Sequence, residues 1–160
     1  MSEVLSERYE YAEIDPKETE CIADLRPRID GNHTMRSAFS RLTPSDEEEP
    51  IDNQDLHFGM FIFENDEDSQ VRVVADLNVV VDSVLVGVSI YILIELDGVK
   101  NKPITEEQAT ALGKWVTHAA YDFAALNMRL MVANNPIIEK LEIPLKPIKP
   151  EFQFVQLSDE

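Results

Sequence analysis

The sequence predicts a single α+β domain over residues 1–160, with an antiparallel meander sheet of four to five strands and one long helix packed on one face. Apolar residues alternate in several short runs before residue 100, which is typical of strands. The links between these runs are too short for parallel crossovers, so neighbouring strands should run antiparallel. After residue 103 the apolar period becomes helical, and an extended, proline-containing C-terminal segment follows.

The clearest strand is VLVGVSIYILIEL, Val84–Leu96. Its even positions are all apolar, and its odd positions still carry Leu85, Tyr91 and Leu93. One face of such a strand can bury against its own core, but the second face is more apolar than solvent exposure requires. We therefore expect these three odd residues, with Tyr121 from the helix that follows, to lie at an interface between copies of the chain.

Four other segments alternate in the same way, and each is predicted to form a strand: Arg8–Ile14, Cys21–Ile29, Leu56–Phe63 and Val71–Val81. Pro27 removes a backbone donor, so the second of these should end at an edge or a bulge. Asp82 and Ser83 are predicted to close a tight hairpin into the strand that starts at Val84. Cys21 is the single cysteine, so no internal disulfide can form.

The segment Pro103–Asn134 is predicted to be one long helix. Thr105 is a suitable N-cap, and Gln108 can complete a capping box. One apolar stripe should face the core: Ala109, Leu112, Val116, Ala119, Phe123, Leu126 and Leu130. Trp115 and Tyr121 lie partly off this stripe, so the helix has more apolar surface than one packing partner needs.

The segment Ile137–Phe154 contains three prolines, which predict an extended chain from Leu141 onward. Its apolar residues should pack rather than dangle: Leu141, Ile143, Leu145, Ile148, Phe152 and Phe154.

The formal net charge is −17, from 31 acidic and 14 basic residues. Nucleic acid and anionic membranes are therefore excluded as expected partners, because both require clustered Lys and Arg. The acids concentrate in a solvated loop over residues 44–55, predicted to lack fixed structure, and in a tail over residues 155–160. With neither a signal sequence nor a long apolar helix, the chain is predicted to be cytoplasmic.

No common catalytic motif is present, so we predict a protein that is not an enzyme and that needs no cofactor or metal. His118 and Asp122 are four residues apart on the predicted helix, and could act as a proton-sharing pair or belong to a solvated charge row. Asn65–Gln70 begins like a calcium loop but lacks the turn glycine. His33 is a lone histidine in a predicted loop.

The order of elements resembles the bacterial SecB-like fold family, which includes the SecB export chaperones and related small proteins of Gram-positive bacteria. LEIPLKPIKPEF, Leu141–Phe152, looks like the segment that follows the main helix in SecB. Ile104–Leu126 occupies the place of that helix, and the resemblance extends over about Leu56–Phe154. The acidic 44–55 loop is not a feature of SecB that we can place. The second C-terminal helix of SecB has no clear counterpart in this chain, since Gln153–Glu160 is short, and this puts docking to SecA in doubt.

The resemblance implies a holdase chaperone for unfolded polypeptides or preproteins, acting in protein transport as a homo-oligomer, either a dimer or a tetramer. Apolar client side chains would enter a groove, and the acidic rim would keep the complex soluble and attract basic clients. The residues expected to bind polypeptide are Trp115, Leu141, Ile143, Leu145, Ile148, Phe152 and Phe154. The plainer alternative is that these residues fill the core of their own chain.

A second function is compatible with the same residues. The chain could be an acidic adaptor or inhibitor, of a kind that phages carry, whose 44–70 segment binds one basic protein partner. The affinity for such a partner would fall steeply as the salt concentration rises. The third possibility is an enzyme with an unfamiliar site at His118 and Asp122.

Overall fold

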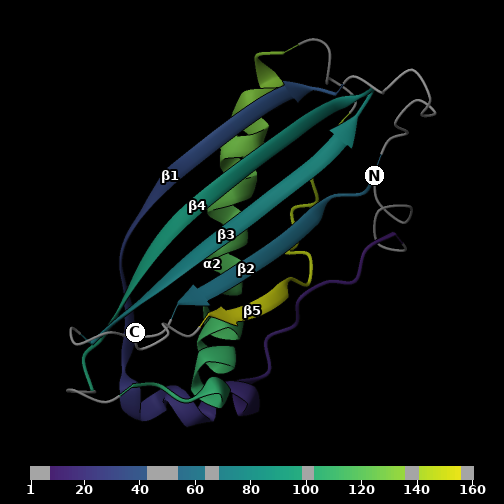
Figure 1. Cartoon of the computed structure of the whole chain (residues 1–160). Helices are drawn as coiled ribbons and strands as arrows, with labels where there is room; N and C mark the ends of the chain where they lie inside the picture. The colour runs from purple at the N-terminus through teal and green to yellow at the C-terminus, as the bar shows by residue number, and fades with distance from the viewer. Residues whose placement is uncertain (1–7, 43–53, 64–68, 99–102, 136–140, 156–160) are drawn as a thin grey trace.

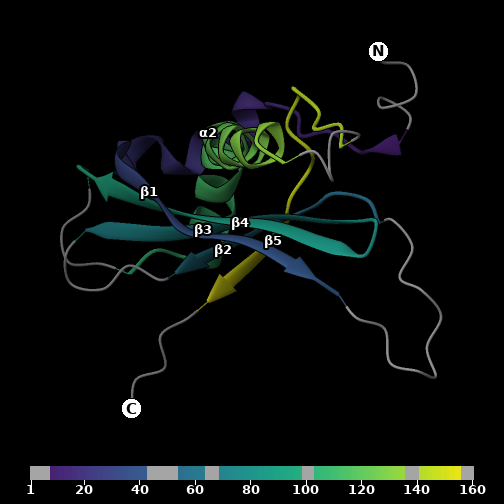
Figure 2. The ribbon, with the colours of Figure 1, turned by 90° about the horizontal axis from the view of Figure 1, so that it is seen from above.

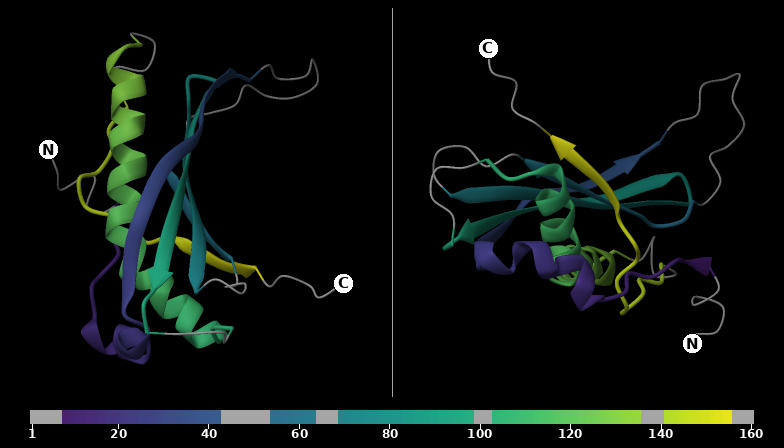
Figure 3. Two further views of the ribbon diagram at one scale, coloured as in Figure 1. Left: turned by 90° about the vertical axis from the view of Figure 1, so that its left-hand side faces the viewer. Right: turned by 90° about the horizontal axis from the view of Figure 1, so that it is seen from below.

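A computed structural model describes residues 8–42, 54–63, 69–98, 103–135 and 141–155 (Figure 1). One layer is a five-stranded sheet of order β1-β4-β3-β2-β5, and helix α2, Glu106–Ala133, crosses one of its faces (Figures 2 and 3). The predicted α+β class is therefore confirmed. The strands are β1 Pro27–Arg41, β2 His57–Phe63, β3 Gln70–Val81, β4 Val84–Leu96 and β5 Glu151–Val155.

The strand β4 has the predicted bounds, and its alternation is reflected in its burial. Every even residue from Val84 to Leu96 is buried, and every odd one is half-exposed. Asp82 and Ser83 both have positive φ, 50° and 63°, which is the conformation of a tight two-residue hairpin between β3 and β4. The predicted hairpin is confirmed. The core lies between this apolar face of the sheet and α2.

The helix α2 begins as its sequence predicts. The Thr105 hydroxyl accepts from the Gln108 backbone N–H at 3.1 Å, and the Gln108 side chain accepts from the Thr105 N–H at 3.0 Å. This is a complete capping box.

The predicted core stripe of α2 is right in its first half and wrong in its second. Ala109, Leu112 and Val116 are buried, but Leu126 and Leu130 are 55 % and 57 % exposed. A 3₁₀ helix lies beside the early turns of α2, whereas Leu126 and Leu130 belong to later turns that extend beyond it (Figure 1). Met128, off the predicted stripe, is fully buried there instead.

The N-terminal strands were predicted wrongly. Arg8–Ile14 forms only an isolated bridge, Tyr11 to Ile148. Most of Cys21–Ile29 belongs to the 3₁₀ helix η1, Pro16–Leu25, and Cys21 is exposed on it. The Asp15 side chain accepts from the Lys17 N–H at 3.0 Å, and Pro16 supplies a first-turn φ that suits a helix.

The strand β1 follows η1, and beyond Ile29 the sequence predicts no strand there and places His33 in a loop. It pairs antiparallel with β4 through two register shifts, at Ile29/Gly31 and at Thr34/Arg36. These bulges hide the alternation that would mark a strand, because each shift moves the following side chains to the opposite face. The edge strand therefore runs over Pro27–Arg41, and only its first three residues belong to the predicted strand Cys21–Ile29.

The strand β5 runs parallel to β2, with Met60 opposite Phe152 and Ile62 opposite Phe154. The sheet is therefore antiparallel except at this edge. Residues 141–150, which we call the strap, connect the region after α2 to β5 without helix, as their prolines predict.

Some predicted features lie outside the described residues. These are most of the 44–55 loop, the tail after residue 155 and the calcium-like positions 65–68. No helix within the described residues combines the length and apolar character needed to span a bilayer.

Candidate functional site

The strap is fixed to the middle of α2 by two side chains. The Tyr121 hydroxyl donates to the Pro144 carbonyl oxygen at 2.6 Å, and Arg129 Nη2 donates to the same oxygen at 3.0 Å. Tyr121 is fully buried, and that burial raises the pKa of its hydroxyl. The hydroxyl therefore stays protonated as a donor. Tyr121 was expected at an interface between copies, and this position inside one chain corrects that expectation.

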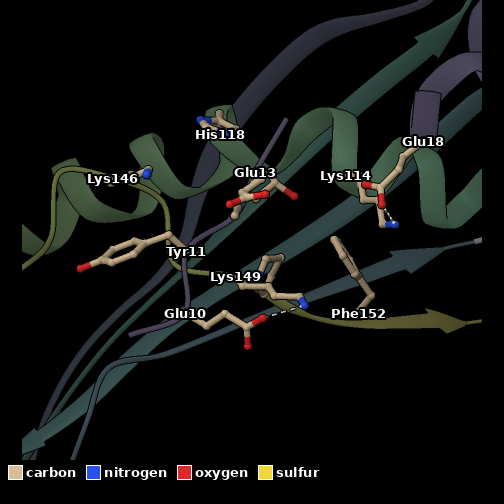
Figure 4. A pocket seen from close by; sticks show the side chains of 12 residues that line it. Glu10, Tyr11, Glu13, Glu18, Lys114, His118, Lys146, Lys149 and Phe152 are labelled. Atoms are coloured by element: carbon tan, nitrogen blue, oxygen red, sulfur yellow. Dashed lines mark hydrogen bonds and ion pairs between the residues drawn. The ribbon is translucent and has the colours of Figure 1, made fainter. Parts of the chain in front are cut away.

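Residues 8–15, which we call the N-terminal segment, lie along the strap on its other side. The Ala12 N–H donates to the Pro147 carbonyl, and the Lys149 N–H donates to the Glu10 carbonyl, each at 2.9 Å. These two bonds flank the Tyr11–Ile148 bridge and make a short antiparallel pairing. The Lys149 ammonium also pairs with the Glu10 carboxylate at 3.0 Å (Figure 4).

The outer end of the N-terminal segment is tied to the residues that precede β2. The Tyr9 hydroxyl accepts from the Leu56 N–H at 3.1 Å, and Arg8 pairs with Asp55. This hydrogen bond to Asp55 raises the pKa of Arg8, which remains a cation. The Tyr9 ring packs against the core.

A cavity of about 460 Å³ lies between the N-terminal segment, α2 and the start of β5 (Figure 4). Its charged lining consists of three lysines and three glutamates: Lys114, Lys146, Lys149, Glu10, Glu13 and Glu18. Lys114 pairs with Glu18 at 3.2 Å, and the Lys146 ammonium lies 5.6 Å from the centre of the Tyr11 ring. The cavity is therefore locally balanced in charge, on a chain whose net charge is −17.

The residues expected to bind polypeptide separate into three groups. Phe152 and Phe154 are half-buried on the side of β5 that faces α2, and Phe152 also lines the cavity. Ile148 is only 6 % exposed and belongs to the core, which corrects the expectation for that residue. Trp115 is 37 % exposed on α2, but it is not among the residues that line the cavity.

The other three residues expected to bind polypeptide lie in the strap, and they differ in exposure. Leu141 and Ile143 are half-buried and pack against the core. Leu145 is 77 % exposed. The structure therefore brings Leu141, Ile143, Phe152 and Phe154 to the side of the molecule that carries the strap, and leaves Leu145 free to contact another molecule.

A second apolar surface runs along the exposed side of α2. We call it the α2 flank, and its members are Trp115, Ala119, Phe123, Leu126 and Leu130. On β1, Phe39 is exposed and lies opposite Val86 in the register, so it faces the same side of the sheet as α2. A 3.0 Å hydrogen bond from Thr34 to Asn127 places β1 beside the flank. The sequence analysis does not find this contribution from β1, because it predicts no strand for residues 30–41.

Half-exposed apolar side chains also lie on the outer face of the sheet, which no helix within the described residues covers (Figure 2). Leu85, Tyr91 and Leu93 are there, as expected. The Tyr91 ring contacts the His33 ring, with centroids 4.8 Å apart. In the sheet register, Tyr91 is opposite Val74 on its other side. This face is thus partly covered by its own cross-strand neighbours.

One similar solved structure is that of a SecB-like chaperone of Mycobacterium tuberculosis in complex with a ChAD peptide from the HigA1 antitoxin. The sequence identity to that chaperone is 17 %, the match covers 73 % of this chain and 93 % of that chain, and the TM-score is 0.42. No protein-family model and no curated protein matches the sequence.

His118 and Asp122, which were considered for catalysis, do not contact each other through a hydrogen bond among the described residues. His118 Nε2 is buried without a hydrogen-bond partner among the described residues, while Asp122 is exposed on α2. Within the described ranges, no group of three His, Cys, Asp or Glu side chains is arranged to hold a metal ion. His118 therefore enters the site as part of the cavity wall.

Proposed function

We propose that this chain is a non-enzymatic polypeptide-binding protein that works as a cytoplasmic homo-oligomer and holds unfolded clients. The observation that carries the proposal is the apolar surface that one copy leaves exposed. Leu126 and Leu130 are more than half exposed one turn apart on α2, and Trp115 continues the same flank. Contiguous apolar surface of this kind marks interaction sites, and a charge of −17 keeps such a molecule soluble.

The α2 flank is proposed as the surface that joins copies of the chain. Phe39 of β1 is exposed on the same side of the sheet, and the hydrogen bond between Thr34 and Asn127 places β1 beside the flank. Large aliphatic side chains gain roughly 1.5–3 kcal/mol each on full burial, so pairing two flanks is favourable. The outer face, with Tyr91 and Leu93, remains proposed as a second contact between copies, since its residues are half-exposed.

The strap side of the molecule is proposed as the client site. Phe152 and Phe154 present aromatic surface beside a cavity of about 460 Å³, which lies within the 300–1,000 Å³ of ordinary ligand pockets. The strap is extended and already accepts one antiparallel pairing from the N-terminal segment. An extended client can use the same backbone groups.

The experiment combines solution mass with client protection. The wild-type chain should have the mass of a dimer or tetramer and should slow the aggregation of two unrelated unfolded proteins. Leu126→Glu with Leu130→Glu should lower the mass towards that of the monomer. Leu93→Glu tests the outer face separately. It should also lower the mass, and an unchanged mass would exclude the outer face as a contact between copies.

Two results would decide against the proposal. A wild-type monomer that leaves client aggregation unchanged removes both the assembly and the holding function. Binding of one basic protein alone, lost steeply between low and high salt, would favour the adaptor instead.

A further inference from the structure

We propose that the N-terminal segment occupies the client site of the resting chain, and that the client replacing it is an extended stretch with aromatic residues on both sides of an acidic one. The proposal rests on the polypeptide-binding function above and specifies its site, its client chemistry and its regulation. The pattern is that of the segment itself, Tyr9-Glu10-Tyr11.

The first argument is the way in which the N-terminal segment is bound. It pairs antiparallel with the strap around Tyr11 and Ile148, through one N–H donated in each direction. An added strand binds by main-chain bonds of this kind, whatever its sequence, and its alternate side chains give specificity. The segment is thus seated on the strap as an incoming polypeptide would be.

The second argument is that both ion pairs of the N-terminal segment are exposed to solvent, whereas the strap is held by a buried hydrogen bond; the Tyr9 ring is the part of the segment that packs against the core. In the Lys149–Glu10 pair the two side chains are 58 % and 76 % exposed, and the Arg8–Asp55 pair is exposed as well. Solvent-exposed pairs add little stability. The strap, in contrast, is bound to α2 through the fully buried Tyr121. The segment can therefore leave while the strap stays in place.

The third argument is the chemistry that surrounds the N-terminal segment. Three of the seven lysines in the chain line the cavity beside it. Lys149 pairs with Glu10, and Lys146 lies over the Tyr11 ring. Among the described residues, Lys146 has no carboxylate partner. An acidic residue between two aromatic ones fits these groups, so the local preference opposes the basic clients expected from net charge.

The test uses the full chain and a labelled peptide with the sequence of residues 8–15, RYEYAEID. Glu10→Lys replaces the pair with Lys149 by a like-charge contact and should free the site. That variant should bind the peptide about fivefold more tightly than the wild-type chain does, the size expected for one exposed pair. Glu20→Lys, an exposed change of the same charge on η1, is the control and should bind as the wild type does.

A second measurement needs no variant. Hydrogen exchange should be followed at the N–H groups of Ala12 and Lys149 in the wild-type chain, with and without excess peptide. Displacement exposes the Ala12 N–H, which belongs to the departing N-terminal segment, so its exchange should accelerate. The Lys149 N–H belongs to the strap and is taken over by the peptide, so it should stay protected. If exchange accelerates at both N–H groups, or at neither, the peptide does not replace the N-terminal segment on the strap.

The peptide with lysine in place of its first glutamate, RYKYAEID, tests the charge preference and should bind Glu10→Lys more weakly than RYEYAEID does. Equal binding of RYEYAEID by Glu10→Lys and Glu20→Lys would overturn occupation of the site by the N-terminal segment. The same variants should also be mixed with an unfolded model polypeptide. If the variants bind the unfolded polypeptide but not the peptide, only this inference fails. If they bind neither, the proposed function fails too.

Discussion

The hydroxyl of Tyr121 and the carbonyl oxygen of Pro144 are 2.6 Å apart, in a part of the molecule from which water is excluded. This bond, together with the one from Arg129 to the same oxygen, joins α2 to the strap, and the strap in turn leads to β5 at the edge of β2. The position of the proposed client site therefore depends on a buried tyrosine that was predicted to face another copy of the chain.

Tyr121→Phe should lower the free energy of unfolding by about 1 kcal/mol, the usual net value of one intramolecular hydrogen bond. The loss is limited because Arg129 still donates to the Pro144 oxygen. Urea denaturation measures the change. Tyr91→Phe on the half-exposed outer face is the control, and an equal effect there would contradict the special role of Tyr121.

Stability should fall in alkali because burial raises the pKa of Tyr121 above the value of about 10 that it has in the unfolded chain. Below that unfolded value both states keep the proton, and the contribution to stability is complete. Above it the unfolded state loses its proton first, so stability decreases as pH rises towards the higher folded pKa.

The measurement is the free energy of unfolding from pH 8 to pH 11 for the wild type and for Tyr121→Phe. The wild-type curve should descend more steeply above pH 10, by up to about 1.4 kcal/mol per pH unit. Parallel curves for the two proteins would show that Tyr121 does not titrate differently in the two states.

Gly113→Ala should destabilise the junction between α2 and β5. A Cβ at Gly113 would lie 2.6 Å from Ile62 Cδ1 and 2.7 Å from Phe152 Cε1, which is closer than packing allows. Overpacking of this kind costs about 1–3 kcal/mol, against a gain of up to about 1 kcal/mol in helix propensity. Thermal unfolding should show a net loss, and hydrogen exchange should show weaker protection of β5.

The matched control for that substitution is Gly87→Ala. A Cβ at Gly87 meets only Asn78 Cβ, at 3.7 Å, which is ordinary contact. This variant should therefore unfold close to the wild-type temperature. If both alanine variants behave alike, the close approach at Gly113 is not what limits the packing of β5.

Thr105→Ala should remove one half of the capping box and lower the free energy of unfolding by about 1 kcal/mol. Thr110→Ala makes the same chemical change one turn later, where the hydroxyl donates only to the Glu106 carbonyl within the helix. That control should leave stability nearly unchanged, because alanine is the better helix former. Chemical denaturation of the two variants in parallel decides the matter.

Much of the fold could be predicted because some segments carry strong local signals. The strand Val84–Leu96 has unbroken alternation, and the helix after Thr105 has a complete capping box. In both, the local pattern and the tertiary environment agree. The hairpin at Asp82 and Ser83 could be predicted because a two-residue link can join only antiparallel neighbouring strands.

The secondary structure predicted for the N-terminal part of the chain was wrong for a different reason. In β1 the bulges at Ile29/Gly31 and Thr34/Arg36 break the period of two, so the pattern resembles a loop. In η1 the capping by Asp15 and Pro16 outweighs the alternation around Cys21. Bulges and short 3₁₀ turns are set by the partners they contact, and a single sequence does not display those partners.

The site was predicted only in part. Phe152 and Phe154 are half-buried beside the strap, and their binding of polypeptide stays a prediction. Ile148 and Tyr121 are covered by their own chain. Apolar spacing alone does not distinguish a residue that meets the core from one that meets another molecule. The exposed second half of the α2 stripe illustrates this, since Leu126 and Leu130 have the same spacing as the buried Leu112 and Val116.

The parallel pairing of β5 with β2 has a consequence for biosynthesis. Translation delivers β1 through β4 and then α2 before it delivers Glu151–Val155. The backbone of β2 therefore keeps one unpaired edge, bordered by Met60 and Ile62, until almost the whole sheet has left the ribosome. Free edges recruit strands from neighbouring chains. Newly made copies should thus be most prone to aggregate after β2 has formed and before β5 is available to pair with it.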